Sequence, residues 1–464
     1  MNTRRSLHSS ALLLLASTLF LFVSDARAQN SSASANTNRT KQAETYPIDL
    51  PMVLRLANAQ NLDVQIARQR LAEAKATYEG AVLQFFPWLS PGVTYRRHEN
   101  LIQDVAGNMF NVNKELYAPG LTLTAQVDVG DALYKSLAAR QSLRAAGQGV
   151  EAQRQDSILA AIQGYFDLAK AQAEVGVATE ARRISKDLEQ QLGHAVAAGI
   201  AYKGDELRVR VQTGQTELAL RRVMEEQRIA AVRLADVLHL DSAVELLAKE
   251  TELVPLALVA TNAALSPLVE QALAKRPELR QSQALLSAAT SAKQGAVYGP
   301  LIPSLGGQAF IGGLGGGRDN TSGVFGESED YSAFLSWRVG PGGLFDFSRT
   351  HLAKSRLETV RLSNEKLHDS VTSEVVANVT RFRSLADQLA TTKRNLETAI
   401  DAQKLAEQRK EFAVGAVLED IQTQQDLTRA RNDFVTIVAE YNKVQYALQR
   451  AIGNSLVEAE SPRH

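Results

Sequence analysis

The chain has 464 residues, and its 51 basic side chains balance 51 acidic ones, so its formal net charge is zero at pH 7. This balance argues against nucleic acid or another polyanion as a partner. The sequence contains no cysteine, which excludes disulfides and a lipid-modified N-terminal cysteine and gives no indication of a redox role.

The first residues predict export. Residues 1–28 combine Arg4 and Arg5, an apolar run and the ending Ala26-Arg27-Ala28, which is typical of a cleaved secretory signal peptide. The apolar run is shorter than the roughly 20 residues that span a membrane as a helix, and no later segment resembles such a span. Residues 29–45 are rich in Ser, Asn, Thr and Ala and are expected to form a flexible leader. The exported protein is therefore either soluble or crosses a membrane as strands.

The mature chain begins with a helical pattern. Residues 50–85 carry apolar positions at helical spacing, and Pro87 and Pro91 are expected to end this helix. Residues 93–97 then alternate with a period of two, which predicts a strand. Residues 101–119 are rich in Asn, Gly and Asp and are expected to form a solvent-exposed loop.

The clearest alternation of the first half lies in residues 121–129. Leu121, Leu123 and Val127 fall on one face, and Thr and Gln residues fall on the other. Such a strand belongs either to a half-buried soluble sheet or to a sheet with lipid on one side and water on the other.

The second half repeats this pattern in residues 304–311 and 331–339. In the latter, Tyr331, Leu335 and Trp337 share a face, while Phe334 interrupts the otherwise polar opposite face. The alternating pattern thus predicts one β-hairpin in each half of the chain. Four strands are too few to close a barrel, since small closed barrels need about eight, so several chains would have to share one.

A second loop is expected at residues 312–330. Its glycine run, residues 312–317, follows a strand but does not open a helix, which argues against a phosphate-binding loop and favours a flexible surface loop.

The remaining sequence predicts helices of unusual length. Residues 131–198 and 347–413 contain no proline, and each could extend about 100 Å. Each is followed by a tight glycine-containing turn and a returning helix, residues 205–240 and 418–452. Helices this long are rarely stable alone, so bundle or coiled-coil partners are expected.

The two halves are built alike. Gly80-Ala81-Val82 returns as Gly295-Ala296-Val297, and the Gly199 turn returns at Gly415, with an offset of about 215 positions. The expected organisation is a signal peptide (1–28), a leader (29–45), a first structural repeat (46–250), a second structural repeat (251–455) and a C-terminal tail (456–464).

No catalytic, cofactor-binding or metal-binding constellation is expected. The seven histidines are dispersed without metal-ligand spacing, so the sequence predicts a protein that is not an enzyme and carries no cofactor.

Over residues 46–453 the chain resembles the TolC family of outer membrane efflux proteins. The resemblance rests on the order and duplication of Ala274-Lys275-Arg276-Pro277-Glu278-Leu279, Asn61-Leu62, the prolines Pro87 and Pro303, the Gly199 and Gly415 turns, and residues 427–453. It implies a mostly α fold with a β-barrel contribution, in which a homotrimer shares a twelve-stranded barrel in the outer membrane that continues into a long helical barrel in the periplasm.

The resemblance also implies the function and its partners. The protein would be a passive exit duct of a tripartite efflux or type I secretion system, working with a periplasmic adaptor (membrane fusion protein) and an inner membrane transporter. Strand residues in contact with outer membrane lipid would be Leu121, Leu123, Val127, Tyr331, Leu335 and Trp337, with Tyr331 and Trp337 also suited to the membrane interface. A register error of one residue would exchange the two faces.

In this family the helical turns lie at the periplasmic tip, where adaptors dock. The corresponding adaptor-contact candidates are Gly199, Tyr202, Lys203, Gly415 and Val417. Lys203, with Arg208 and Arg210, could instead form inter-helix pairs or ordinary solvated surface.

The resemblance further implies an acidic constriction at the tip. Asp420 is the position matched to the family's constricting aspartate, and Glu419 and Asp205 are further gate candidates. A ring of carboxylates in a narrow passage would attract cations. In the alternative interpretation, Asp420 caps the returning helix and Glu419 is solvated.

Two alternatives stay open at this point. A soluble periplasmic coiled-coil adaptor or scaffold would use the strands in a small soluble sheet and would be extracted without detergent. A conduit for secreted polypeptides would share the architecture of a small-molecule duct, and the partner would decide the cargo.

Overall fold

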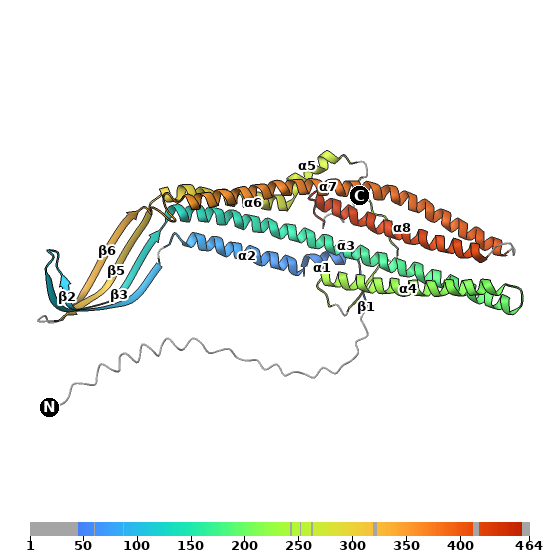
Figure 1. Cartoon of the computed structure of the whole chain (residues 1–464), viewed down its shortest axis with the longest axis horizontal. Coiled ribbons are helices and arrows are strands. Elements are labelled where there is room, and N and C mark those ends of the chain that lie inside the picture. The colour runs from blue at the N-terminus through green and yellow to red at the C-terminus, as the bar shows by residue number, and fades with distance from the viewer. Residues whose placement is uncertain are drawn as a thin grey trace, which may run out of the picture. The chain divides into compact units, whose positions relative to one another are not determined.

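The computed structural model describes residues 45–456, apart from positions 60, 87, 242–243, 251, 261–262, 319–322 and 412–416. The expected signal peptide, nearly all of the leader and most of the C-terminal tail lie outside the described residues. From Thr45 onward the chain forms a unit of long helices with a sheet at one end (Figure 1). Within the described part of the chain, no helix has both the length and the apolar character needed to cross a membrane.

The same series of two helices, two strands and two helices occurs in each half, and β1, β4 and η1 are additional to it. The first half contains β1 (Thr45–Ile48), α1 (Leu50–Ala59), α2 (Leu62–Leu83), β2 (Trp88–Gln103), β3 (Met109–Val127), α3 (Val129–Ala197), α4 (Lys203–Val237) and β4 (Glu245–Ala248). The second half contains α5 (Leu265–Lys275), α6 (Pro277–Tyr298), the short 3-10 helix η1 (Gly299–Leu301), β5 (Ser304–Gly317), β6 (Val324–Ser336), α7 (Phe347–Glu411) and α8 (Val417–Ala451). Because α2-β2-β3-α3-α4 is followed by α6-β5-β6-α7-α8, we propose that residues 46–250 and 251–455 are two copies of one repeat.

The first helical segment is divided at Asn61. Its side-chain oxygen accepts a hydrogen bond from the Val64 amide at 3.2 Å, which caps the start of α2. The Asn61 amide nitrogen also donates to the Val237 carbonyl at the end of α4. The single helix expected over residues 50–85 is therefore two helices, and the second of them ends at Leu83.

The four long strands form one antiparallel sheet in the order β2-β3-β5-β6. Each half supplies one hairpin, which confirms the prediction. Pairing of β3 with β5 joins the halves and places Leu121 opposite Ile311. β2 and β6 are the edge strands of this sheet.

The strands of the first hairpin are longer than expected. Most of the loop expected at residues 101–119 belongs to β2 and β3, and only residues 104–108 connect them. Pro91 lies within β2, opposite Leu121, and does not end a helix. An edge strand tolerates proline, since one side of the strand makes no ladder bonds. Pro87 lies outside the described residues.

The second hairpin differs from expectation in the same way. The glycine run at residues 312–317 belongs to β5, and β6 already begins at Val324, so the expectation of a flexible surface loop is wrong for these residues. β6 ends at Ser336, which leaves Trp337 just beyond the strand.

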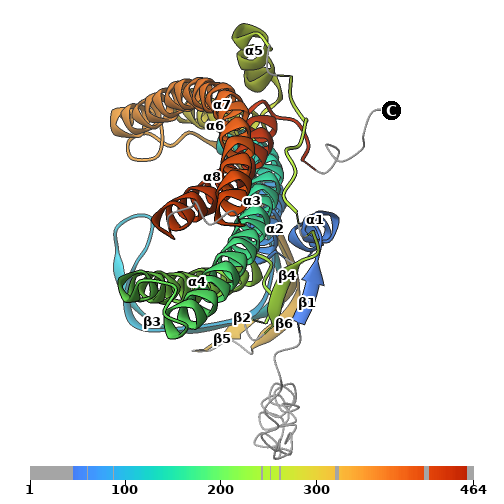
Figure 2. The same cartoon turned by 90° about the vertical axis from the view of Figure 1, so that its right-hand side faces the viewer.

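The prediction of long paired helices is confirmed. α3 and α7 contain 69 and 65 residues, and α4 and α8 return along them with 35 residues each. Viewed along the helices, α3 lies between α4 and α8 in a curved layer (Figure 2).

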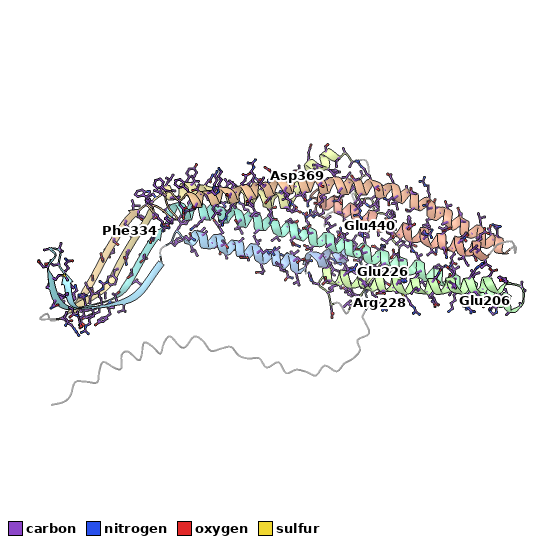
Figure 3. All side chains as sticks on the ribbon, viewed as in Figure 1. Glu206, Glu226, Arg228, Phe334, Asp369 and Glu440 are labelled. Atoms are coloured by element: carbon purple, nitrogen blue, oxygen red, sulfur yellow. The ribbon has the colours of Figure 1, made fainter. Side chains whose placement is uncertain are left out.

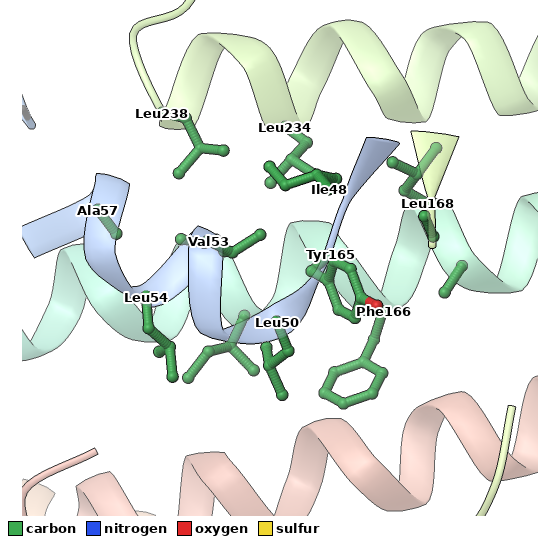
Figure 4. Packing of buried hydrophobic residues seen from close by; sticks show 14 of the residues in the cluster. Ile48, Leu50, Val53, Leu54, Ala57, Tyr165, Phe166, Leu168, Leu234 and Leu238 are labelled. Atoms are coloured by element: carbon green, nitrogen blue, oxygen red, sulfur yellow. The ribbon is translucent and has the colours of Figure 1, made fainter. Parts of the chain in front are cut away.

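The largest apolar core lies where α1, α3 and α4 meet the short parallel pair β1 and β4 (Figure 4). Ile48, Val53, Tyr165 and Leu234 are fully buried there. Burying each such side chain stabilises the fold by roughly 1.5–3 kcal/mol. A second core joins α5, α6, α7 and α8 around Phe382.

Candidate functional site

One face of the sheet is apolar and exposed. Directly opposed residues of antiparallel strands share a face, and Leu123, Ala309 and Tyr331 are opposed across β3, β5 and β6. Tyr331 and Leu335 are each more than 60% exposed. All lipid-contact candidates that lie within strands share this face: Leu121, Leu123, Val127, Tyr331 and Leu335. An exposed apolar surface of this kind is typical of a membrane or protein contact.

Trp337 follows the last residue of β6. Its indole nitrogen donates to the Leu301 carbonyl at 3.3 Å, and about half of its side chain is exposed. The residue therefore lies at the junction between sheet and helices, a position suited to an amphipathic aromatic side chain.

The opposite face of the sheet is largely polar, with Thr122, Thr124, Gln308 and Ser332 among its members. Phe334, marked in Figure 3, lies on this face. A Cβ at Gly306 would overlap its ring, so the glycine on the neighbouring strand provides the space that the ring occupies.

Glycines in β5 serve the apolar face in the same manner. The rings of Phe325 and Tyr117 stack with their centroids 6.0 Å apart, and they occupy the space above Gly313 and Gly315. Sequence reasoning assigned these glycines to a loop because it considered their backbone freedom but not the aromatic partners across the strands.

The turn between α3 and α4 forms one part of the helical tip. Gly199 has a left-handed φ of +74°, which favours glycine, and its amide donates to the Val196 carbonyl. Ile200 and Tyr202 are 83% and 74% exposed. The turn thus presents two large apolar side chains to its surroundings.

The basic residues near this turn form ion pairs within the chain. Glu206, which is labelled near the end of α4 in Figure 3, accepts hydrogen bonds from both Lys203 and Arg210 and is only 5% exposed. The hydrogen bond from Lys203, together with the charge of Arg210, holds the pKa of Glu206 below its usual value. Asp205, a gate candidate, accepts instead from Arg208 at 3.3 Å. Sequence reasoning missed Glu206, although its spacing from Lys203 and Arg210 is that of helical ion pairs.

The predicted turn residue Gly415 lies outside the described residues. Val417 begins α8, and Glu419 and Asp420 lie in its first turn. Glu419 accepts from Arg409 of α7 at 2.6 Å.

Asp420 is largely buried. Its carboxylate accepts from the Gln403 side chain of α7 at 3.3 Å. Asp420 and Glu419 therefore both interact with α7, and carboxylates in the first turn of α8 also favour its N-terminus.

A polar seam connects α8 to α3 and α4 just above the tip. The Gln424 amide donates to the Ala181 carbonyl at 3.0 Å, and the Gln425 amide donates to the Gln212 side chain at 2.7 Å. The helix pairs α3-α4 and α7-α8 are therefore joined here by hydrogen bonds between uncharged groups. Beyond the seam lies a small apolar cluster of Leu188, Leu192, Val209 and Ile421.

A buried ionic network fixes the middle of the helical part. Arg450 of α8 donates to Asp156 of α3 at 2.8 Å, and it also pairs with Glu278 and Glu374. Arg276 pairs with Glu374 at 2.5 Å and with Glu278 at 3.0 Å. Two arginines thus bind three carboxylates and join the two halves of the chain.

Amide side chains of α8 hold the segment that connects the halves. The Leu258 amide donates to the Gln445 side chain at 2.7 Å, and Gln445 donates back to the Leu256 carbonyl at 3.0 Å. Asn442 makes the corresponding pair of bonds to Leu256 and Val254. The backbone of this extended segment thus obtains hydrogen bonds that a neighbouring strand would otherwise provide.

Comparison with known proteins identifies the architecture. The structure is similar to the CmeC outer membrane channel of Campylobacter jejuni, with a TM-score of 0.76, 16% sequence identity, and coverage of 87% of this chain and 85% of that one. It is also similar to the outer membrane protein VceC of Vibrio cholerae, with a TM-score of 0.73, 16% identity, and coverage of 88% and 96%. The open state of the MtrE outer membrane channel of Neisseria gonorrhoeae gives a TM-score of 0.69 at 16% identity, with coverage of 88% and 89%. No curated protein matches the sequence.

The fold is therefore that of an outer membrane channel protomer. Residues 268–454 match the family model described as outer membrane efflux protein. The resemblance to the TolC family of outer membrane efflux proteins, and the fold expected from it, are thereby confirmed.

Proposed function

We propose that the protein is a passive outer membrane exit duct that receives its cargo from other components of a tripartite efflux or type I secretion system. The observation that supports this most strongly is the two-faced sheet. Its apolar face is exposed in the protomer, its other face is largely polar, and its edge strands β2 and β6 have no partners within this sheet beyond β3 and β5. Lipid on one side and water on the other would satisfy both faces.

The duct is a homotrimer in this proposal. Four strands are too few to close around an aqueous passage, and three copies would supply twelve. β6 of one copy would pair with β2 of the next, which removes both open edges. Leu121, Leu123, Val127, Tyr331 and Leu335 would then contact outer membrane lipid, and Trp337 would lie at the interface near the helices.

The helices would extend into the periplasm and place the tip toward an adaptor and an inner membrane transporter. Exposed Ile200 and Tyr202 beside the Gly199 turn would provide apolar adaptor contacts. Val417 at the start of α8 and Gly415, a candidate from the sequence alone, would add to them. Lys203 would contribute indirectly, since it pairs with Glu206. The transporter would supply the energy and the cargo.

Asp420, Glu419 and Asp205 remain the proposed acidic residues of the tip. Glu419 and Asp205 are partly exposed and could face the passage while paired with their arginines. Asp420 is shielded beside Gln403, so it would contribute most when α7 and α8 separate.

Single-channel conductance and reversal potential of the purified protein in a planar bilayer test this proposal. Discrete cation-selective currents are expected, because carboxylates at a constriction attract cations. Asp420→Asn should lower the cation preference, whereas Asp426→Asn, which removes an exposed carboxylate paired with Arg429, should leave it unchanged. Unchanged selectivity in Asp420→Asn would remove that residue from the gate. A protein that stays soluble without detergent and never inserts would contradict the duct itself.

A further inference from the structure

A groove of about 720 Å³ lies between α3, α6 and α7. Figure 1 shows that these three helices run side by side near the sheet. Its floor is formed by small residues of α6, namely Ala289, Ala292, Gly295 and Ala296, and Tyr134 and Leu352 form apolar walls. A volume of this size accommodates a drug-sized molecule. All of these lining residues belong to three helices of one chain.

The groove continues toward the polar face of the sheet. Asp131 lines both the groove and a small adjoining crevice. The crevice is bounded by Ser304 and Arg338, and Ser304 belongs to the polar face, where it is opposed to Ser336. In a duct whose polar sheet face surrounds the passage, the groove would therefore open toward the passage.

The charges of the groove are unbalanced. Arg349, Arg356 and Lys135 line it, whereas Asp131 is the single acidic lining residue. Arg349 donates to Asp131 at 2.5 Å and so neutralises that carboxylate. Among the residues that the structure describes, Arg356 and Lys135 have no carboxylate partner within ion-pair distance. An apolar floor between two cations suits a ligand that combines an apolar body with an anionic group.

We propose that this groove binds anionic amphiphiles on their way through the duct. The inference rests on the proposed function, since it places a weak cargo site in the wall of the passage. The small side chains of α6 would admit the apolar body, and Lys135 and Arg356 would bind the sulfate or carboxylate group at the groove's edge. Such a site would favour anionic amphiphiles in a duct whose tip attracts cations.

The test uses the full chain in lipid nanodiscs and two probes with the same tail. Octyl sulfate and octyl glucoside share an eight-carbon chain but differ in charge, and calorimetric titration below their micelle concentrations measures binding, with empty nanodiscs as the blank. Saturable binding of octyl sulfate that is tighter than that of octyl glucoside is expected. Lys135→Gln and Arg356→Gln should each weaken octyl sulfate binding about two- to fivefold, as expected for partly solvated charge pairs. Lys354→Gln, a charge removal on α7 outside the groove lining, should leave it unchanged.

Filling the groove provides the decisive comparison. Ala292→Trp should abolish saturable binding of both probes, and Ala289→Leu, a smaller change on the same floor, should weaken it if the tryptophan variant does not fold. Binding that persists in a folded Ala292→Trp variant would place the probe in the lipid or elsewhere on the protein and overturn the proposal. Conductance of the same purified protein in a planar bilayer separates the two proposals. Pores without saturable binding overturn the groove alone, whereas binding without pores overturns the duct and the placing of the groove in its wall.

Discussion

Removing Arg450 should loosen the connection between the two halves of the chain. Its side chain is 8% exposed, and its guanidinium pairs with Asp156, Glu278 and Glu374. Arg450→Met keeps the apolar stem but leaves these carboxylates without their shared cation. Breaking a buried ion pair by removing one partner costs about 3–5 kcal/mol.

The lower end of that range applies here. Asp156 keeps half of its side chain exposed, so water can replace the lost contact, whereas Glu278 is only 18% exposed and bears most of the loss. Arg276 continues to neutralise part of the site. A loss of about 3 kcal/mol corresponds to a fall of about 3.5 °C in the unfolding midpoint, at about 2.1 cal/mol/K of unfolding entropy per residue over the roughly 400 described residues.

Thermal unfolding followed by circular dichroism in detergent measures this shift. Arg429→Met is the matched control, because it breaks an exposed pair in the same helix and should cost less than about 1 kcal/mol. Arg450→Lys should fall between wild type and Arg450→Met, since one ammonium cannot form the same forked contacts. Equal midpoints for Arg450→Met and Arg429→Met would refute the reasoning.

Three further predictions concern the tip, the sheet and the connecting segment. Lys203 lowers the pKa of Glu206, so the pairing stabilises the fold above the ordinary pKa of 4.5, and this stability is lost as the pH falls through the lower folded-state pKa. The unfolding midpoint of Glu206→Gln should therefore depend less on acid pH than that of wild type. An equal pH dependence of the two midpoints would contradict the pairing. The valine side chain of Gly306→Val should overlap the Phe334 ring, destabilise the sheet by about 1–3 kcal/mol and reduce the amount of assembled protein on native gels. Adding Phe334→Ala should restore the assembled protein. An absence of rescue would show that the ring is not the obstacle. Gln445→Leu removes two hydrogen bonds to the connecting segment at a cost of about 1–3 kcal/mol. Amide hydrogen exchange at residues 256–258 should therefore become faster. Unchanged protection of these amides would contradict the role assigned to Gln445.

Sequence reasoning performed best where structure depends on local pattern. The absence of proline and the regular spacing of small and apolar residues predicted α3 and α7, and alternation around Leu121 and Tyr331 predicted strands with the correct shared face. The glycine turn at Gly199 was also recognisable, because the left-handed backbone there favours this residue type.

Features that depend on distant partners could not be predicted in the same way. The glycines of β5 resemble a loop until Tyr117 and Phe325 are placed above them from neighbouring strands. Arg450 and Asp156 are 294 positions apart, so no spacing rule brings them together. At the tip, the composition indicated acidic candidates, but only the packing of α7 against α8 shows that Asp420 is sheltered by Gln403.

The open sheet makes the unassembled protomer prone to pairing with other extended chains. β2 and β6 extend over 16 and 13 residues, and each presents an unpaired edge beside an apolar face. Such edges pair readily with any extended chain. In the proposed assembly, a newly made copy would therefore need either a holding chaperone or prompt pairing with other copies. The concentration of unassembled chains should then limit the yield of the protein more than the stability of its helices does.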